Sequence, residues 1–319
     1  MRKIVVFNKM SDPLSHELEV FRSFSDVEVV KSPAVTEDEL IRDAIDAEVI
    51  LFSAAKLTRR VLYSLKKCKL IVRYGIGYDT VDTEAARELG IYVCNSPTYG
   101  VTDVAEHAFA LMLSCTKHLP RMTDRIREGN WSFVNMGKWQ RLSGKTVGFL
   151  GFGRIARAVA GFTVPFNTQN IVYDPYVSDE VIKEYNARKV SLDELLSACD
   201  YLSVHLPLSD STYHLIGRDE LARMKRSAII INTSRGSVID ESALVDALAD
   251  GVIAGAGLDV FEDESGGVDP RLVKMNNVTL TPHVAWNTEE AVHALSCEVA
   301  ANVKKYLEGN RPDSVVNGL

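Results

Sequence analysis

The stretch from Lys145 to Pro175 constrains the fold of this chain more than any other; it reads KTVGFLGFGRIARAVAGFTVPFNTQNIVYDP. An apolar run ends at Gly-Phe-Gly, a segment with apolar residues at helical spacing follows, and a second apolar run ends at Asp174. Strand, glycine turn, helix, strand and acid, in that order, form a dinucleotide-binding βαβ unit. Gly151 permits the tight turn. Gly153 lets the backbone approach a pyrophosphate at the helix N-terminus, where free N–H groups favour negative charge.

Asp174 indicates which dinucleotide this unit binds. Its carboxylate is placed to accept hydrogen bonds from the adenosine ribose hydroxyls, and it would repel the 2′-phosphate of NADP. The next residues, Pro175 and Tyr176, offer no cation for that phosphate. Ala156 stands at the third small position of the glycine motif, which allows Gly or Ala. The sequence therefore predicts NAD as the cofactor.

Length and charge limit the other possibilities. A chain of 319 residues with 46% hydrophobic and 25% charged residues is typical of a globular protein of two domains. The net charge of −7, without a basic cluster, argues against a nucleic-acid partner. The apolar run in MRKIVVFN is too short for a signal peptide, and no stretch has the length of a membrane span. We expect a cytoplasmic protein without a membrane partner.

The cysteines favour the same compartment. There are five of them, an odd number, and no two form a CxxC pair. They therefore indicate small core residues in a reducing environment and predict neither a disulfide framework nor a metal site. They are Cys68, Cys94, Cys115, Cys199 and Cys297.

Strand-like and helix-like segments alternate along most of the chain. This alternation predicts an α/β fold with two doubly wound parallel sheets. The nucleotide unit lies in mid-chain and a long apolar helix is expected over 288–307, so we expect that helix to complete the first domain. The predicted domains are residues 1–99 with 288–319, and residues 100–287. We expect no added regulatory domain after the closing helix.

A long helix is expected from Val101 to Glu128, broken by Pro120. Apolar residues cover more than one of its faces, which favours burial between domains or between subunits. The segment that follows, Gly129 to Ser143, has aromatic residues and no period, and we expect an irregular loop that closes over another part of the protein.

Six polar or glycine residues follow the ends of predicted strands. The carboxyl ends of parallel strands lie on one side of a sheet, where ligands bind, so we expect these residues to gather at one edge. They are Gly151, Asp174, His205, Arg235, Asp259 and His283.

Two of these side chains suit acid–base chemistry on an anionic substrate. The planar guanidinium of Arg235 can pair with a carboxylate in two parallel hydrogen bonds and can polarise a neighbouring carbonyl. His283 follows Thr281-Pro282, where the proline holds Thr281 extended, and an imidazole exchanges its proton near neutral pH. The other histidines lie in helical or turn segments and are interpreted as structural: His16, His107, His118, His214 and His293.

An acidic run near Phe261 offers a partner for His283. A carboxylate facing the imidazole would stabilise its protonated form, which a proton donor to a carbonyl oxygen needs. The residue pattern leaves Glu262, Asp263 and Glu264 as alternatives. Separately, two glycines in the segment Arg73 to Asp79 expose backbone N–H groups that suit an anion, although an ordinary strand-to-helix turn is an equal alternative.

Together these segments resemble the D-isomer-specific 2-hydroxyacid dehydrogenases. The resemblance covers nearly the whole chain. Its motifs are RYGIGYDTVD, CNSPTYGVTDVAEHAFALML, LSGKTVGFLGFGRIARAVA, YDPY, SVHLPL, MKRSAIIINTSRGSVID, AGAGLDVFEDE and LTPHVAW.

The resemblance implies a flavodoxin-like substrate domain, a Rossmann NAD domain and a homodimer built on the helix near 101–128. It implies NAD-dependent interconversion of a small 2-oxo acid and its D-(R)-2-hydroxy acid. Arg235 would bind the substrate, His283 would be the acid/base and Glu264 its partner, while Gly75 and Ile76 would hold the substrate carboxylate through backbone N–H groups. The implied NAD contacts, beyond Gly151 and Gly153, are Arg154, Ile155, Asp174, His205, Pro207, Thr233, Asp259 and Trp286.

Two points bear on the choice of substrate and activity. Phe52 stands where phosphoglycerate-specific relatives often carry an arginine for the substrate phosphate. This difference weakens the case for a phosphorylated substrate, although Arg73 remains available. The alternative to an enzyme is an NAD-sensing protein, similar to the corepressors that resemble this family; turnover of 2-oxo acids with NADH distinguishes the two.

Overall fold

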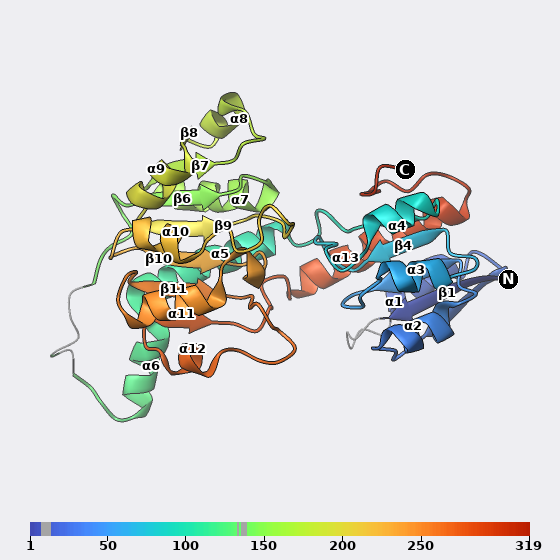
Figure 1. Ribbon diagram of the computed structural model, residues 1–319, viewed down its shortest axis with the longest axis horizontal. Coiled ribbons are helices and arrows are strands. Elements are labelled where there is room, and N and C mark those ends of the chain that lie inside the picture. The colour runs from blue at the N-terminus through green and yellow to red at the C-terminus, as the bar shows by residue number, and fades with distance from the viewer. Residues whose placement is uncertain (8–13, 133, 135–138) are drawn as a thin grey trace. The chain divides into compact units, whose positions relative to one another are not determined.

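The computed structural model describes residues 1–7, 14–132, 134 and 139–319. The chain forms two compact units (Figure 1). The first unit joins Met1–Gly100 to Thr288–Leu319, and the second is Val101–Asn287. Segments from both ends of the chain therefore build the first unit.

The first unit is built on a parallel sheet of five strands in the order β2-β1-β3-β4-β5, which is the flavodoxin-like order. The central strands β3 and β4 are apolar along nearly their whole length because helices cover both faces. The strands are β1 (Arg2–Phe7), β2 (Val27–Lys31), β3 (Val49–Phe52), β4 (Leu70–Arg73) and β5 (Tyr92–Cys94). The helices are α1 (Ser15–Phe21), α2 (Glu37–Ala44), α3 (Arg59–Ser64), α4 (Thr83–Glu88) and α13 (Glu289–Leu307).

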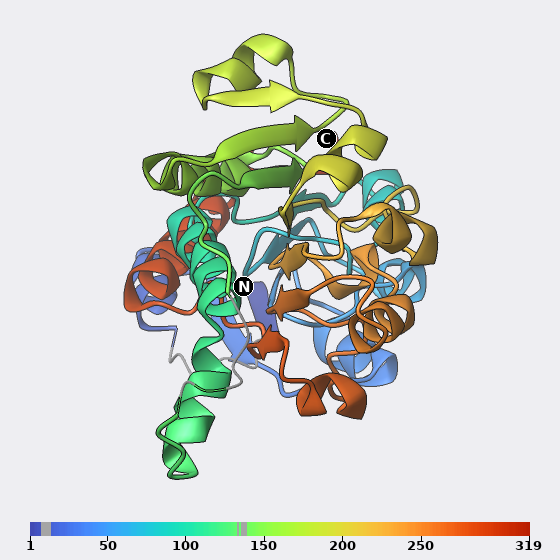
Figure 2. The ribbon, with the colours of Figure 1, turned by 90° about the vertical axis from the view of Figure 1, so that its left-hand side faces the viewer.

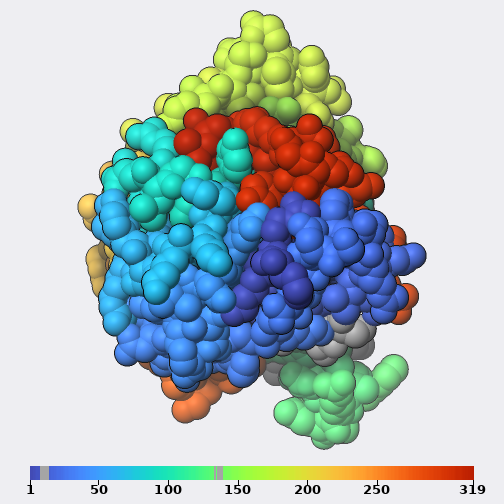
Figure 3. Space-filling view, turned by 90° about the vertical axis from the view of Figure 1, so that its right-hand side faces the viewer, coloured from blue at the N-terminus to red at the C-terminus, as the bar shows by residue number. Residues whose placement is uncertain are grey.

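Two hydrophobic clusters hold this sheet. Side chains of α2, α3 and α4 pack on one face, and those of α1 and α13 pack on the other. The C-terminal tail stays with the unit: Ser314 exchanges hydrogen bonds with Asn95, and the Arg2 guanidinium donates to the Leu307 carbonyl at 2.8 Å. Figure 3 shows the C-terminal residues lying against the N-terminal part of the chain.

The second unit contains a parallel sheet of seven strands in the order β12-β11-β10-β9-β6-β7-β8. The strand order reverses between β6 and β9, and such a switch point is where doubly wound sheets bind ligands. The strands are β6 (Thr146–Leu150), β7 (Gln169–Tyr173), β8 (Ala187–Lys189), β9 (Tyr201–Val204), β10 (Ile229–Asn232), β11 (Gly255–Leu258) and β12 (Val278–Leu280). With the first unit, this confirms the predicted fold class.

Helices also cover both faces of the larger sheet. Residues of α5 and α7 pack on one face, whereas residues of α9, α10 and α11 pack on the other. The helices are α5 (Val101–Lys117), α6 (Leu119–Arg127), α7 (Arg154–Thr163), α8 (Asp179–Glu184), α9 (Leu192–Ala198), α10 (Arg218–Arg223), α11 (Glu241–Ala249) and α12 (Pro270–Lys274), with short 3₁₀ turns η1 (Val164–Phe166) and η2 (Gly236–Val238).

The long helix expected over 101–128 is two helices, and the expected position of its break was wrong. The break is at His118, which has a left-handed backbone (φ 51°). Pro120 lies in the first turn of α6, where its missing N–H costs no hydrogen bond. Helix α6 projects away from the sheet of its unit (Figures 1 and 2). The loop expected over 129–143 lies partly outside the described residues, Phe133 among them.

Within the described residues, no helix is long and apolar enough to cross a membrane.

Candidate active site

The glycine turn after β6 has the geometry that a dinucleotide pyrophosphate needs. Gly151 has a positive φ of 86°, and a Cβ there would lie 2.9 Å from the His205 carbonyl oxygen, so a side chain is excluded. A Cβ on Gly153 would meet no atom within 4 Å, which leaves open space at the start of α7. No side chain caps this ten-residue helix, and Arg154 and Ile155 form its first turn. The free N–H groups there suit an anion.

Asp174 ties this turn to the end of β7. Its Oδ2 accepts from the Phe152 N–H at 2.8 Å, and its Oδ1 accepts from the N–H groups of Tyr176 and Val177 at 2.8 and 3.2 Å. A carboxylate has about four lone-pair positions, so one remains for a ribose hydroxyl. The residue is 9% exposed. Asp174 therefore fits the predicted ribose contact and also holds the glycine turn in place.

His205 and Thr233 follow the neighbouring strands β9 and β10. His205 stacks on Phe149, and its Nε2 lies 2.8 Å from the Ser203 hydroxyl. Burial lowers the pKa of His205 to about 4, so this imidazole is neutral at pH 7. The hydroxyl of Thr233 is buried without a hydrogen-bond partner among the described residues, which suits a contact with a bound ligand. Pro207 lies exposed just beyond His205.

Arg235 follows β10 and lies against the acidic segment after β11. Its guanidinium donates to the Ser234 carbonyl at 2.8 Å, while its own carbonyl accepts from the Asn232 amide at 2.9 Å. The next residue, Gly236, touches the backbone of Phe261: a Cβ on Gly236 would lie 2.0 Å from the Phe261 carbonyl carbon. The glycine thus brings the arginine loop and the acidic segment into direct backbone contact.

His283 and Glu264 form a pair. The imidazole Nδ1 lies 2.8 Å from Glu264 Oε2, and the side chains are 37% and 43% exposed. Burial alone would raise the pKa of the Glu264 carboxyl, but the hydrogen bond and charge of His283 and the nearby charge of Arg235 lower it overall. Since Nδ1 is engaged by the carboxylate, Nε2 is the ring nitrogen available to a substrate.

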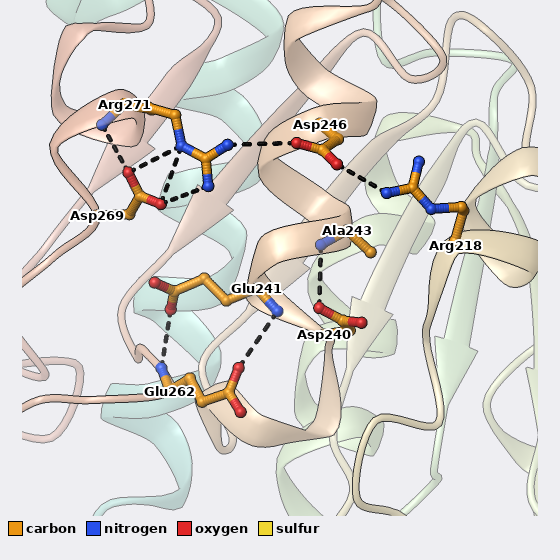
Figure 4. A network of polar contacts seen from close by, with 8 residues as sticks. All are labelled: Arg218, Asp240, Glu241, Ala243, Asp246, Glu262, Asp269 and Arg271. Atoms are coloured by element: carbon orange, nitrogen blue, oxygen red, sulfur yellow. Dashed lines mark hydrogen bonds and ion pairs between the residues drawn. The ribbon is translucent and has the colours of Figure 1, made fainter.

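The other two acids of the run have different partners, and the structure therefore distinguishes the three alternatives. Glu262 accepts from the Glu241 N–H and donates its own N–H to the Glu241 carboxylate at 2.8 Å (Figure 4). Its Oε1 also lies 2.7 Å from His214 Nε2. Asp263 accepts from the N–H groups of Ser265 and Gly266. These contacts fasten the segment at both sides of Glu264, which alone of the three faces His283.

A further network beside this segment joins α10, α11 and the start of α12 (Figure 4). Asp246 joins Arg218 at 2.7 Å to Arg271 at 3.3 Å, and Arg271 also pairs with Asp269. These ion pairs are exposed and each contributes little to the free energy of folding.

Asp259 follows β11 and is completely buried. Its Oδ1 accepts from the Thr281 hydroxyl at 2.6 Å and from the Val284 N–H at 3.0 Å, and its Oδ2 accepts from the Ala285 N–H at 2.9 Å. The carboxylate thus binds the loop that carries His283. Trp286, at the end of this loop, donates its indole N–H to the His283 carbonyl.

Gly75 and Ile76 lie in the first unit, after β4. The Gly75 N–H already donates to the Arg73 carbonyl at 3.0 Å, and the Gly75 and Ile76 carbonyls accept from Ser96 and Asn95. Among the described residues, the N–H groups of Ile76 and Gly77 have no hydrogen-bond partner. The Ile76 and Gly77 N–H groups therefore remain available to an anion, whereas the Gly75 N–H is already engaged.

Comparison with known proteins identifies the family. Residues 109–285 match the model of the D-isomer specific 2-hydroxyacid dehydrogenase, NAD binding domain. A D-3-phosphoglycerate dehydrogenase of Methanocaldococcus jannaschii is 39% identical over 99% of this chain, which spans 60% of that relative's length. A glyoxylate reductase of Thermococcus litoralis is 37% identical over 94% of this chain and 93% of the relative.

A solved structure agrees with these relatives. The D-lactate dehydrogenase of Aquifex aeolicus, complexed with NAD and lactic acid, has a TM-score of 0.87 and 31% identity, covering 96% of each chain. The chain therefore belongs to the D-isomer specific 2-hydroxyacid dehydrogenases, a family of NAD-dependent oxidoreductases. These comparisons favour the dehydrogenase over the NAD-sensing alternative and support NAD as the cofactor.

Proposed function

We propose that the protein reduces a small 2-oxo acid to its D-(R)-2-hydroxy acid with NADH, and catalyses the reverse reaction with NAD. The observation that carries this proposal is the 2.8 Å contact between His283 and Glu264, with Arg235 close enough to lower the pKa of the Glu264 carboxyl. An acid, its supporting carboxylate and a cation for the substrate thus come from three strand ends of one sheet.

Each side chain has a definite task in the reduction. Bound NADH supplies the hydride that adds to C2 of the ketone. His283 delivers the proton from Nε2 to the ketone oxygen, so that the C=O bond becomes an alcohol. Glu264 stabilises the protonated imidazole before that transfer, and Arg235 pairs with the substrate carboxylate and polarises the carbonyl.

For the cofactor, we propose contacts from the glycine turn and from the neighbouring strand ends. The open space at Gly153, the remaining acceptor of Asp174 and the unpartnered Thr233 hydroxyl support them. The proposed set is Gly151, Gly153, Arg154, Ile155, Asp174, His205, Pro207, Thr233, Asp259 and Trp286. The unit of Val101–Asn287 is then the NAD-binding domain, and the other unit, with Gly75, Ile76 and Gly77, is the substrate-binding domain.

We favour an unphosphorylated substrate. Phe52 is completely buried in β3, so its position contributes an apolar ring to the core and no cation for a phosphate. Relatives include glyoxylate and hydroxypyruvate reductases, which supports acids of that size. We expect hydroxypyruvate to react with a higher kcat/KM than its 3-phosphate.

The test is NADH oxidation, followed by absorbance, with glyoxylate, hydroxypyruvate, pyruvate and 3-phosphohydroxypyruvate. Chiral chromatography of the lactate formed from pyruvate should give the (R) isomer. Failure of every acid to oxidise NADH would refute the function, and an (S) product would refute the proposed facial selectivity. A preference for the phosphorylated acid would overturn the substrate class and leave the reaction intact.

We also propose a homodimer through the helical segment of residues 101–128, of which α6 is the exposed part. None of the nine residues of α6 is buried, and Leu119 and Ile126 are each 53% exposed, while Trp131 is 89% exposed. Such apolar exposure favours a partner surface. Light scattering should give twice the chain mass, and the double change Leu119→Asp and Ile126→Asp should lower it to that of one chain.

A further inference from the structure

A second histidine lies beneath the loop that carries His283. His107, on α5, places its Nε2 2.9 Å from the Thr281 hydroxyl oxygen, and that hydroxyl donates to Asp259 Oδ1 at 2.6 Å. A hydroxyl has one proton, and the carboxylate takes it, so the imidazole must be the donor in the first contact. His107 therefore keeps a proton on Nε2 and begins a chain of hydrogen bonds that ends on Asp259.

Asp259 determines the shape of the His283 loop. Its carboxylate accepts from Val284 and Ala285, and its backbone carbonyl accepts from the His283 N–H at 2.8 Å. His283 itself has a left-handed backbone, with φ of 53°. For a residue other than glycine, this conformation is unfavourable, because Cβ comes too close to the backbone. The surrounding hydrogen bonds must offset that cost for the loop to persist.

We propose that His107 is a positioning residue for the acid/base His283. It fixes the Thr281 hydroxyl, which in turn fixes the Asp259 carboxylate that holds the left-handed loop. Without the His107 N–H, the Thr281 hydroxyl loses its donor and one of the two contacts that orient it. The imidazole of His283 is then held less well. Misplacement by about 1 Å lowers turnover by up to about 100-fold.

The test rests on the proposed dehydrogenase function and uses the full chain. His107→Phe removes the donor, while His107→Gln can retain an N–H near the same place. We expect kcat for glyoxylate reduction to fall roughly 10- to 100-fold in His107→Phe, with a much smaller change in the substrate KM. His107→Gln should remain within about threefold of the wild type. Ser114→Ala is the matched control. Ser114 lies on the same helix as His107 and contacts Thr279 at 3.4 Å, so its replacement leaves the hydrogen bonds to Asp259 unchanged.

A second measurement needs no substrate. Amide hydrogen exchange, followed by mass spectrometry on the ligand-free protein, should be faster over residues 281–287 in His107→Phe and unchanged in Ser114→Ala. If His107→Phe does not fold, Thr281→Val and Thr281→Ser form the equivalent pair, since serine keeps the hydroxyl.

The outcomes are separable. Wild-type kcat in His107→Phe, an equal loss in the glutamine variant, or unchanged exchange over 281–287 would each overturn the positioning role. A wild-type protein that reduces no 2-oxo acid would refute the proposed function instead, and the exchange rates would then decide the role of His107.

Discussion

Gly236→Ala should separate two of the proposed catalytic groups without altering either of them. The new Cβ would lie 2.0 Å from the Phe261 carbonyl carbon and 2.5 Å from the Glu262 nitrogen, both of them backbone atoms. An ordinary contact begins at 3.4 Å, so the backbone must retreat by about 1.4 Å. The acidic segment cannot do this freely, because Glu262 is fastened to Glu241 and His214. Glu264 would then move relative to Arg235.

The expected effect has two parts. Displacement of this size lowers kcat by about 100-fold. Overpacking costs about 1–3 kcal/mol of unfolding free energy, and each kcal/mol lowers Tm by about 2–4 °C in a unit of this size. Steady-state kinetics with NADH and a thermal melt measure both effects.

Gly161→Ala is the control for this prediction. Gly161 lies in α7, and its added Cβ would meet no atom within 4 Å. Alanine in a helix is more favourable than glycine by about 0.5–1 kcal/mol, so this variant should keep its activity and melt no lower than the wild type. A Gly236→Ala protein with wild-type kcat and Tm would refute the packing argument.

Further predictions concern the cofactor and pH. Asp174→Ser should weaken NAD binding and narrow the preference for NAD over NADP; an unchanged ratio of the KM values for NAD and NADP would contradict the ribose contact. The same change should lower Tm, because three backbone N–H groups lose their acceptor. The pKa of Glu264 is lowered in the folded protein, so its ionised form stabilises the fold above the ordinary carboxyl pKa and this contribution is lost as pH falls through the lowered value. The free energy of unfolding of the wild type should therefore fall more between neutral and acid pH than that of Glu264→Gln. Parallel curves of unfolding free energy against pH for the two proteins would contradict the Glu264–His283 pairing.

The sequence predicted the parts of the fold that depend on local patterns. The buried parallel strand β3 is a continuous apolar run, and the glycine turn followed by Asp174 marks the nucleotide unit. The sequence predicts the helix break at Pro120, because proline usually breaks helices, but His118 adopts the left-handed conformation and Pro120 lies in the first turn of α6.

Residues that act through tertiary contacts could not be predicted in this way. Gly236 follows Arg235 like any turn glycine, and only the approach of Phe261 explains why it has no side chain. The sequence indicates a structural role for His107 because it lies in a helical segment, and nothing local indicates that Thr281 faces it. The acidic run offered three equivalent carboxylates until the contacts of Glu262 and Asp263 distinguished them.

The proton donor is the centre of this account, and one variant tests it most directly. His283→Gln should bind NADH with the wild-type Kd, measured by nucleotide fluorescence, while kcat for 2-oxo acid reduction falls by roughly 10²–10⁴. Turnover close to that of the wild type, at unchanged NADH affinity, would contradict the assignment of His283 as the acid/base.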